Sequence, residues 1–516
     1  MPTLPLLTRE LIQSRALAGR TDVSAPNAAL LDLPETVLQF GTGAFLRGFV
    51  DYFIDAANRQ GMFNGRVVAV GSTRSGREQL LTEQNGLYTL ASRGIAEGRA
   101  VQDVRIISSV SRALSARDAW DEVLTLARAP ELRLIVSNTT EVGITLDEDD
   151  ALQLAPPRSY PGKLTRFLLE RARAFDFDAA KGVLVLPCEL IEMNGERLRE
   201  TVLALSARWK LGNEFVSWLE SAVPFCNTLV DRIVPGAPPP DEAAALQQRL
   251  DYRDGLITTC EVYRLFVIEG GDAVRARLGF AGVDPGVIVT DDVAPYRERK
   301  VRLLNGTHTI MAPVALLCGC ETVGAAVEHE LVGRFVRRVL LEEILPTVSA
   351  PDADTFAGDV LDRFANPYIR HSLFDISLQG TTKLRVRIVP TIRLAAERGG
   401  GGGGGGDAPQ ALAFGFAAYL RFMRGDLQAA RRAAGLAVPP DDLGQRITAL
   451  WSVAPNDGRP DLAGVVRAAC ADETTWGEDL TGVPNFAEAV TAHLTRIVRD
   501  GALAALGSLL AEPAAV

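Results

Sequence analysis

The sequence predicts an α/β protein, with a mostly parallel, doubly wound sheet in its N-terminal part and a mainly α-helical C-terminal domain. Apolar, β-rich runs alternate with segments long enough for helices in the first part of the chain, which is the pattern of such a sheet. After about Tyr296, long helical patterns replace the strand-like runs. A chain of 516 residues also exceeds what one typical core can serve, so we expect two domains.

The strand-like runs set the order of the first domain. We expect strands at 36–40, 66–70, 132–136 and 182–186. A helix is expected over 45–55, directly after a turn with glycines, and further helices at 327–345 and 411–423. The expected division is an N-terminal extension at 1–35, a dinucleotide-binding domain at 36–295 and a helical substrate domain at 296–516.

Eight consecutive glycines, Gly399 to Gly406, interrupt the helical part. Such a run has no side chains to pack and a large backbone entropy. A phosphate-binding loop would need a strand before it and a helix after it. We therefore interpret 399–406 as a flexible insertion.

Composition and charge exclude several classes of protein. The formal net charge is −10 and the basic residues are scattered, so a nucleic-acid-binding surface is not expected. We expect a cytoplasmic enzyme with no membrane partner, because the chain has no signal-like start and no long uninterrupted apolar stretch. Cys318 and Cys320 have no second pair of ligands beside them, so no metal is expected.

A glycine turn follows the first expected strand and opens the next helix. Gly41 would allow a tight turn and Gly43 would let the backbone approach a pyrophosphate, as in a Rossmann-like domain. Leu46 stands where the third glycine of that fingerprint would fall, so the motif alone is weak. The cofactor-binding candidates in this turn are Phe40, Gly41, Gly43, Ala44 and Phe45.

The end of the second strand should carry the residue that reads the adenosine ribose. The stretch from Gly71 to Arg74 has no carboxylate for a ribose 2′-hydroxyl, whereas Arg74 could receive the 2′-phosphate of NADP. A solvated loop arginine is an equal alternative. Ser72 and Arg74 are therefore candidates, and the choice between NAD and NADP stays open.

Lys300, Asn305 and His308 place an amine, an amide donor and an imidazole within nine residues. Reduction of a carbonyl needs a proton donor for the developing alkoxide and groups that stabilise its negative charge. If the segment is helical, Lys300 and His308 lie close to one face, although we expect Gly306 to interrupt or strain the helix.

The spacing of these three residues resembles the active-site motif of the mannitol dehydrogenase family, the polyol-specific long-chain dehydrogenases. The stretch 223–235, centred on Val230, Asp231 and Arg232, is similar to the signature of that family. Further stretches of the chain resemble the members of this family that act on hexuronates. These stretches are 39–47, 85–89, 137–144, 187–191, 366–371 and 382–387.

The resemblance implies an NAD-dependent oxidoreductase that interconverts D-tagaturonate and D-altronate by hydride transfer without a metal. It implies Lys300 as general acid in ketone reduction and general base in the reverse reaction, with Asn305 polarising the reacting oxygen and His308 orienting the substrate. The alternatives are the fructuronate/mannonate or mannitol/fructose pairs and, in a different class, a catalytically idle dinucleotide-binding sensor.

The family carries a second oxyanion donor in a Cys-Asp-Asn motif, and this chain departs from it. Here the stretch reads Cys188, Glu189, Leu190, so either Asn194 or a different group is expected to take that task. The resemblance also adds Ser137 and Asn138 to the cofactor-binding candidates.

The expected partner is a small sugar acid, whose carboxylate needs a cation. Arg370, His371 and Lys383 are the candidates, because they lie in family-like motifs and Arg and Lys bind carboxylates well. Asp231 and Arg232 complete the substrate-binding candidates and are expected to shape the cleft. The sequence predicts no oligomeric state.

Overall fold

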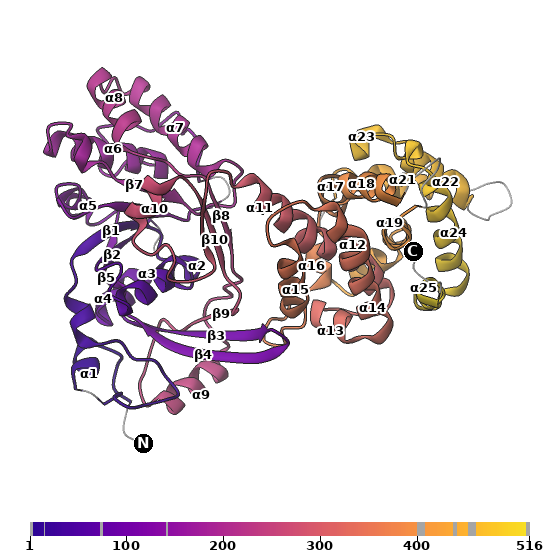
Figure 1. The fold of residues 1–516 in the computed structure, drawn as a ribbon, viewed down its shortest axis with the longest axis horizontal. Helices are drawn as coiled ribbons and strands as arrows, with labels where there is room; N and C mark the ends of the chain where they lie inside the picture. The colour runs from indigo at the N-terminus through magenta and orange to yellow at the C-terminus, as the bar shows by residue number, and fades with distance from the viewer. Residues whose placement is uncertain are drawn as a thin grey trace. The chain divides into compact units, whose positions relative to one another are not determined.

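The computed structural model describes residues 4–14, 16–72, 76–140, 143–399, 408–436, 441–452 and 461–511. The chain divides into two compact units (Figure 1), one formed by 1–94 and 100–293 and the other by 95–99 and 294–516. Two sequence-based candidates, Arg74 and the glycines 400–406, lie outside the described residues. Within the described parts, no helix is long and apolar enough to cross a membrane.

A five-stranded sheet organises the first unit, in the order β5-β2-β1-β6-β7 (Figure 1). Its four strand pairings are all parallel, with Leu38 of β1 opposite both Val68 and Ile135. Numbered along the chain, this order reads 3-2-1-4-5, which is that of a Rossmann-like sheet. The doubly wound fold is therefore confirmed. The strands are β1 (Glu35–Phe40), β2 (Arg66–Gly71), β5 (Val110–Ser115), β6 (Leu134–Ser137) and β7 (Leu184–Pro187).

Alternation of side chains gives the sheet two buried faces. Val37 and Ala69 face one core, which also holds helix α3 and a smaller sheet, whereas Leu38 and Val68 face the other. That second core is completed by helices on the opposite side of the sheet. The helices of this unit's two layers are α2 (Ala44–Arg47), α3 (Val50–Arg59), α4 (Arg77–Glu83), α5 (Trp120–Leu126), α6 (Tyr160–Ala174), α7 (Asn194–Arg208) and α8 (Asn213–Ala222).

Two three-stranded sheets extend this unit, and the sequence did not indicate them. One has the order β11-β10-β8 and the other β4-β3-β9. Their strands are β3 (Tyr88–Ala96), β4 (Arg99–Ile107), β8 (Thr228–Asp231), β9 (Thr258–Cys260), β10 (Leu265–Glu269) and β11 (Val287–Thr290), and the remaining helices are α1 (Arg9–Gln13), α9 (Pro240–Leu250) and α10 (Asp272–Leu278). Leu7, Leu17 and Leu31 of the N-terminal segment are buried against Leu250 and Tyr252 in a third core.

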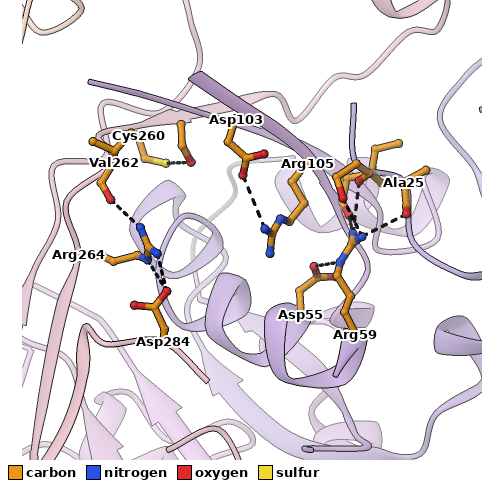
Figure 2. Close-up of polar contacts among 12 residues, drawn as sticks. Ala25, Asp55, Arg59, Asp103, Arg105, Cys260, Val262, Arg264 and Asp284 are labelled. Atoms are coloured by element: carbon orange, nitrogen blue, oxygen red, sulfur yellow. Dashed lines mark hydrogen bonds and ion pairs between the residues drawn. The ribbon is translucent and has the colours of Figure 1, made fainter. Parts of the chain in front are cut away.

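Arginine side chains connect the helix α3 and the strand β10 to neighbouring segments of this unit, as Figure 2 shows. Arg59, at the end of α3, pairs with Asp55 one turn earlier (2.6 Å) and donates to the carbonyl of Ala25 (3.1 Å). Arg264, the residue before β10, pairs with Asp284 (2.6 Å), and its guanidinium lies 5.1 Å from the centre of the Tyr52 ring of α3. These contacts join helix α3 to the N-terminal segment and brace the loops around β10.

From Ala294 onward, the described part of the second unit is mainly helical. The prediction of a helix at 411–423 is confirmed by α19 (Gln410–Phe422), which is buried along most of its length and packs against α12 and α24. The single helix expected at 327–345 is wrong, because His329 leaves the helical conformation (φ −70°, ψ 123°) and caps the next helix. A new helix begins there and passes at Val339 into a π-helical stretch.

The α-helices of the second unit are α11 (Ala294–Arg299), α12 (Thr307–Leu317), α13 (Val323–Glu328), α14 (Glu330–Arg338), α15 (Ala353–Phe364), α16 (Leu373–Ser377), α17 (Gly380–Arg387), α18 (Val389–Gly399), α19, α20 (Asp426–Ala433), α21 (Gly444–Leu450), α22 (Leu462–Cys470), α23 (Glu473–Trp476), α24 (Phe486–Asp500) and α25 (Ala502–Ala511). The π-helical stretch η3 (Lys300–Gly306) joins α11 to α12 without a break in the helical path, and a second one, η4 (Val339–Ile344), continues α14 into the 3-10 turn Leu345–Thr347.

Candidate functional site

The glycine turn of the first unit has the geometry that a dinucleotide needs. Gly41 follows β1 with φ +131° and donates its N–H to the Val70 carbonyl (2.9 Å), and a Cβ on it would lie 3.1 Å from the carbonyl oxygen of Asn138. A Cβ on Gly43 would meet nothing within 4 Å. Protein atoms therefore fill the space beside Gly41, whereas the space beside Gly43 is empty, so that the backbone at Gly43 can approach a ligand.

The other residues of the turn differ in what they expose. Ala44 and Phe45 stay partly exposed at the start of α2, whereas Phe40 is buried and its ring packs on Tyr160 (5.2 Å between ring centroids). The backbone carbonyl of Phe40 accepts from the N–H of Asn138 (3.1 Å). Phe40 thus supports the turn from the core.

A later glycine does the close packing that the fingerprint assigns to its third position. Leu46, at that position, is buried in the core. Gly48 ends α2, and a Cβ on it would lie only 2.8 Å from Cγ1 of Val234, so a larger residue would force the loop after β8 away. The spacing of the glycines in the sequence does not predict this contact, because Val234 lies far along the chain from Gly48.

Glu78 places a carboxylate at the end of β2, where the sequence indicated none. A Cβ on Gly71 would lie 1.7 Å from Oε1 of Glu78, so the carboxylate covers the last residue of the strand. Thr42, inside the glycine turn, donates its hydroxyl to the same oxygen (3.0 Å). The stretch 71–74 itself has no carboxylate, and this acid comes instead from the first turn of α4. Ser72 is exposed beside it.

Glu189 holds the loop after β6 and was not among the candidates. Its carboxylate accepts from the N–H of Thr139 (2.9 Å) and the hydroxyl of Ser137 (3.1 Å), and burial raises its pKa. Asn138 donates to the carbonyl of Cys188 (2.7 Å) and is partly exposed beside Gly41. Ser137 is buried and committed to Glu189, so Asn138 is the residue of this pair that has exposed surface.

Asn194 is fully buried, and its amide is engaged by the protein. Its Nδ2 donates to the carbonyl of Pro187 (3.0 Å) and lies within 3.1 Å of the carbonyl of Glu189, while its Oδ1 accepts from the N–H of Thr228 (2.8 Å). These bonds join β7, α7 and β8. The geometry therefore argues against Asn194 as a donor to substrate, because such an amide has no polar atom left to offer.

Arg232 is likewise committed to the fold. Its guanidinium donates to the carbonyls of Gly48 (2.7 Å) and Glu261 (3.0 Å) and to the hydroxyl of Ser92 (3.0 Å). Asp231, the last residue of β8, is buried next to it. Arg232 thus positions the Gly48 turn, and each of its three nitrogens donates to the protein.

Lys300, Asn305 and His308 lie on one continuous helical path in the second unit. Lys300 begins the π-helical stretch that ends at Gly306, and α12 starts directly afterwards. Gly306 keeps helical dihedral angles (φ −63°, ψ −50°), so the expectation that it interrupts the helix is wrong, and the path from Lys300 to Gly306 is π-helical. All three side chains are half-buried, which leaves them accessible.

His308 is packed among side chains brought from distant parts of the sequence. Its ring lies 4.3 Å from that of Phe364 and 5.0 Å from that of His371, centroid to centroid, and the two imidazoles meet edge to face. Burial lowers the pKa of His371, and Lys383 acts in the same direction. The structure therefore joins two predicted residues, His308 and His371.

Lys383 and Arg370, the remaining candidates for binding a substrate carboxylate, differ in how far their side chains are exposed. Lys383 donates its Nζ to the carbonyl of Ile376 (2.9 Å), and burial together with Arg387 lowers its pKa. The side chain of Arg370 is 85% exposed, and its ion pair with Glu321 spans 4.0 Å between two solvated groups. Arg370 lies at the surface, so the structure does not support it as a buried carboxylate anchor.

In the described part of the chain, no group of three or more His, Cys, Asp or Glu side chains could hold a metal ion. All six cysteines are free thiols, and most of them are buried.

Comparison with known proteins identifies the family. Residues 35–282 match the mannitol dehydrogenase Rossmann domain and 292–498 match the mannitol dehydrogenase C-terminal domain. The altronate oxidoreductase of Bacillus subtilis is 42% identical over 473 residues, covering 92% of this chain and 95% of the relative. That of Yersinia pestis bv. Antiqua is 41% identical over 481 residues, covering 92% and 97%.

Solved structures share the fold. Pseudomonas fluorescens mannitol 2-dehydrogenase, in a ternary complex with NAD and D-mannitol, superposes with a TM-score of 0.66 at 24% identity, over 98% of this chain and 100% of that one. A D-sorbitol dehydrogenase in substrate-free form gives a TM-score of 0.76 at 22% identity, over 97% and 100%. The two domain matches and the relatives of 41–42% identity show that the chain belongs to the mannitol dehydrogenase family.

Proposed function

We propose that this enzyme interconverts D-tagaturonate and D-altronate by hydride transfer with NAD(H). The observation that carries the proposal is the identity of 41–42% to altronate oxidoreductases over 92% of the chain. The first unit would bind the dinucleotide and the second would supply the groups that act on the substrate. Mannonate/fructuronate and mannitol/fructose chemistry are the alternatives that the assay below separates.

The residues around the glycine turn fit a dinucleotide. The open space at Gly43 would receive the pyrophosphate, and Asn138 lies beside the turn. The carboxylate of Glu78 supports NAD rather than NADP, because it would accept hydrogen bonds from the ribose hydroxyls and repel a 2′-phosphate. When bound, the nicotinamide ring supplies or accepts the hydride.

Lys300 would protonate the carbonyl oxygen of tagaturonate during reduction and take the proton back during oxidation of altronate. The Asn305 amide would donate a hydrogen bond to the same oxygen, where negative charge develops. His308, held by Phe364 and His371, would orient the substrate hydroxyls.

Purified protein should be assayed by nicotinamide absorbance with tagaturonate, fructuronate and fructose, each with NADH and NADPH. We expect turnover of tagaturonate with NADH. Robust reduction of fructuronate or fructose without tagaturonate would replace the proposed substrate, and cofactor binding without any turnover would favour the sensor.

The role of Lys300 is tested by Lys300→Ala. We expect turnover to fall by about 10²–10⁴, the usual contribution of a general acid–base group, with NADH affinity unchanged. Lys210→Ala, which changes an exposed lysine of the first unit, is the matched control. Near-normal turnover in Lys300→Ala would refute the assigned role.

A further inference from the structure

A hexuronate differs from a neutral ketohexose by one carboxylate, so the proposed function requires a cation that can receive it. Arginine is the best partner, since its guanidinium makes two parallel hydrogen bonds to a carboxylate. Arg370 is at the surface, and Lys383, whose Nζ also donates to the carbonyl of Ile376, offers a point charge rather than a planar pair of donors. An arginine near His308 therefore has to be considered.

Arg387 is attached to the helix that carries Asn305 and His308. Its NH1 donates to the hydroxyl of Thr309 (3.2 Å), and that hydroxyl donates to the carbonyl of Asn305 (2.7 Å). The backbone of Arg387 also packs on the π-helical stretch, because its carbonyl oxygen would lie 3.5 Å from a Cβ on Gly306. The guanidinium is thus anchored one residue away from His308.

Arg387 also stands one helical turn after Lys383 on α17, so the two side chains share a face. Lys383 acts on the pKa of His371, whose ring meets that of His308. Arg387, Lys383, His371 and His308 therefore form a linked cationic and imidazole cluster within the second unit.

Arg387 carries a charge with which no acid of the described residues forms an ion pair. Other arginines of this unit pair with acids, for example Arg393 with Glu478 and Arg446 with Asp472. Arg387 has no such pair among the described residues, and its side chain is half-buried. Burial lowers the pKa of its guanidinium, and no acid opposes that shift. A partly desolvated cation whose bonded partner is a neutral hydroxyl is costly unless an anion joins it.

We propose that Arg387 binds the carboxylate of the substrate, with Lys383 contributing a second positive charge, and that this pair selects hexuronates over neutral ketohexoses. The proposal rests on the proposed function, which supplies the carboxylate. Lys383 was a candidate from the sequence, whereas Arg387, four residues later in the same stretch, was not.

The test compares Arg387→Met with wild type. Removing a charge-assisted hydrogen bond should lower kcat/KM for tagaturonate by about 10- to 100-fold and raise the inhibition constant of altronate in proportion. Activity on fructose should change little, because fructose has no carboxylate. Arg387→Lys should recover part of the loss and guards against a folding defect in the methionine variant, which thermal unfolding would reveal.

Arg385→Met is the matched control, since it removes a positive charge from the same helix and Arg385 contacts the carbonyl of Thr474 at 3.4 Å. We expect its preference for tagaturonate to equal that of wild type. Equal losses on tagaturonate and fructose in a folded Arg387→Met enzyme would overturn the proposal and leave Arg387 a purely structural role. Wild-type enzyme that turns over no ketohexuronate would instead remove the proposed function, and the anchor with it.

Discussion

Asn194→Ala tests whether a buried amide serves the fold or the reaction. In wild type the N–H of Thr228 is bonded to Asn194 Oδ1, whereas Gly195 N–H also reaches Asn227 and the Pro187 carbonyl also accepts from the Thr228 hydroxyl. The alanine variant therefore leaves chiefly one buried N–H, that of Thr228, without an acceptor, which costs about 1–3 kcal/mol of folding free energy. It also loses further hydrogen bonds, each of which contributes about 1 kcal/mol. We expect the free energy of unfolding to fall by roughly 3 kcal/mol.

Urea unfolding followed by tryptophan fluorescence measures this change, because Trp209 and Trp218 lie at the end of α7 and in α8. Turnover per folded molecule should stay near that of wild type. Asn213→Ala, an exposed asparagine at the start of α8, is the control and should shift stability by less than about 0.5 kcal/mol. Unchanged unfolding together with a loss of turnover of about 10²-fold or more would refute the reasoning and make Asn194 an oxyanion donor.

Three further predictions concern the cofactor, the pH dependence of stability and the glycine run. Glu78→Gln should lower kcat/KM with NADH by about 10-fold and raise the relative use of NADPH, and an unchanged NADH to NADPH ratio would contradict the role of this carboxylate. Burial raises the pKa of the Asp51 carboxyl from 3.8 to about 7, so this group stabilises the fold fully below pH 3.8 and the stabilisation is lost as the pH rises through 7. Asp51→Asn should remove a fall of roughly 4 kcal/mol over that window in urea titrations, and an identical slope in both proteins would contradict it. Shortening 399–406 to two glycines should leave kcat unchanged, and a large loss of turnover would contradict the interpretation as an insertion.

The sequence predicted the features that depend on neighbouring residues. Alternating apolar runs located β1 and β2, and the glycine turn between β1 and its helix was read from Gly41 and Gly43. Features that depend on distant contacts escaped it. Gly48 is needed because of Val234, and the short strands of the two smaller sheets carry too few residues for a clear period.

The same distinction holds for the candidate site. Lys300, Asn305 and His308 were found because they lie within nine residues. His371 came from a motif, but only the fold shows that its ring meets that of His308. Glu78 and Arg387 matter through neighbours on other elements, and nothing in their local sequence marks them apart from other charged residues.

The π-helical stretch from Lys300 to Gly306 separates two sets of side chains along one helical path. Each residue of an α-helix advances by about 100° around the axis, and a π turn holds one residue more than an α turn. Wound as a regular α-helix, the same nine residues would turn Lys300 by about 100° relative to His308, because the π turn takes up one residue without the rotation that an α-helix would add. The stretch therefore sets the angular phase between the amine and the imidazole, and a shift of this segment between π- and α-helical winding would re-aim one against the other without any change of sequence.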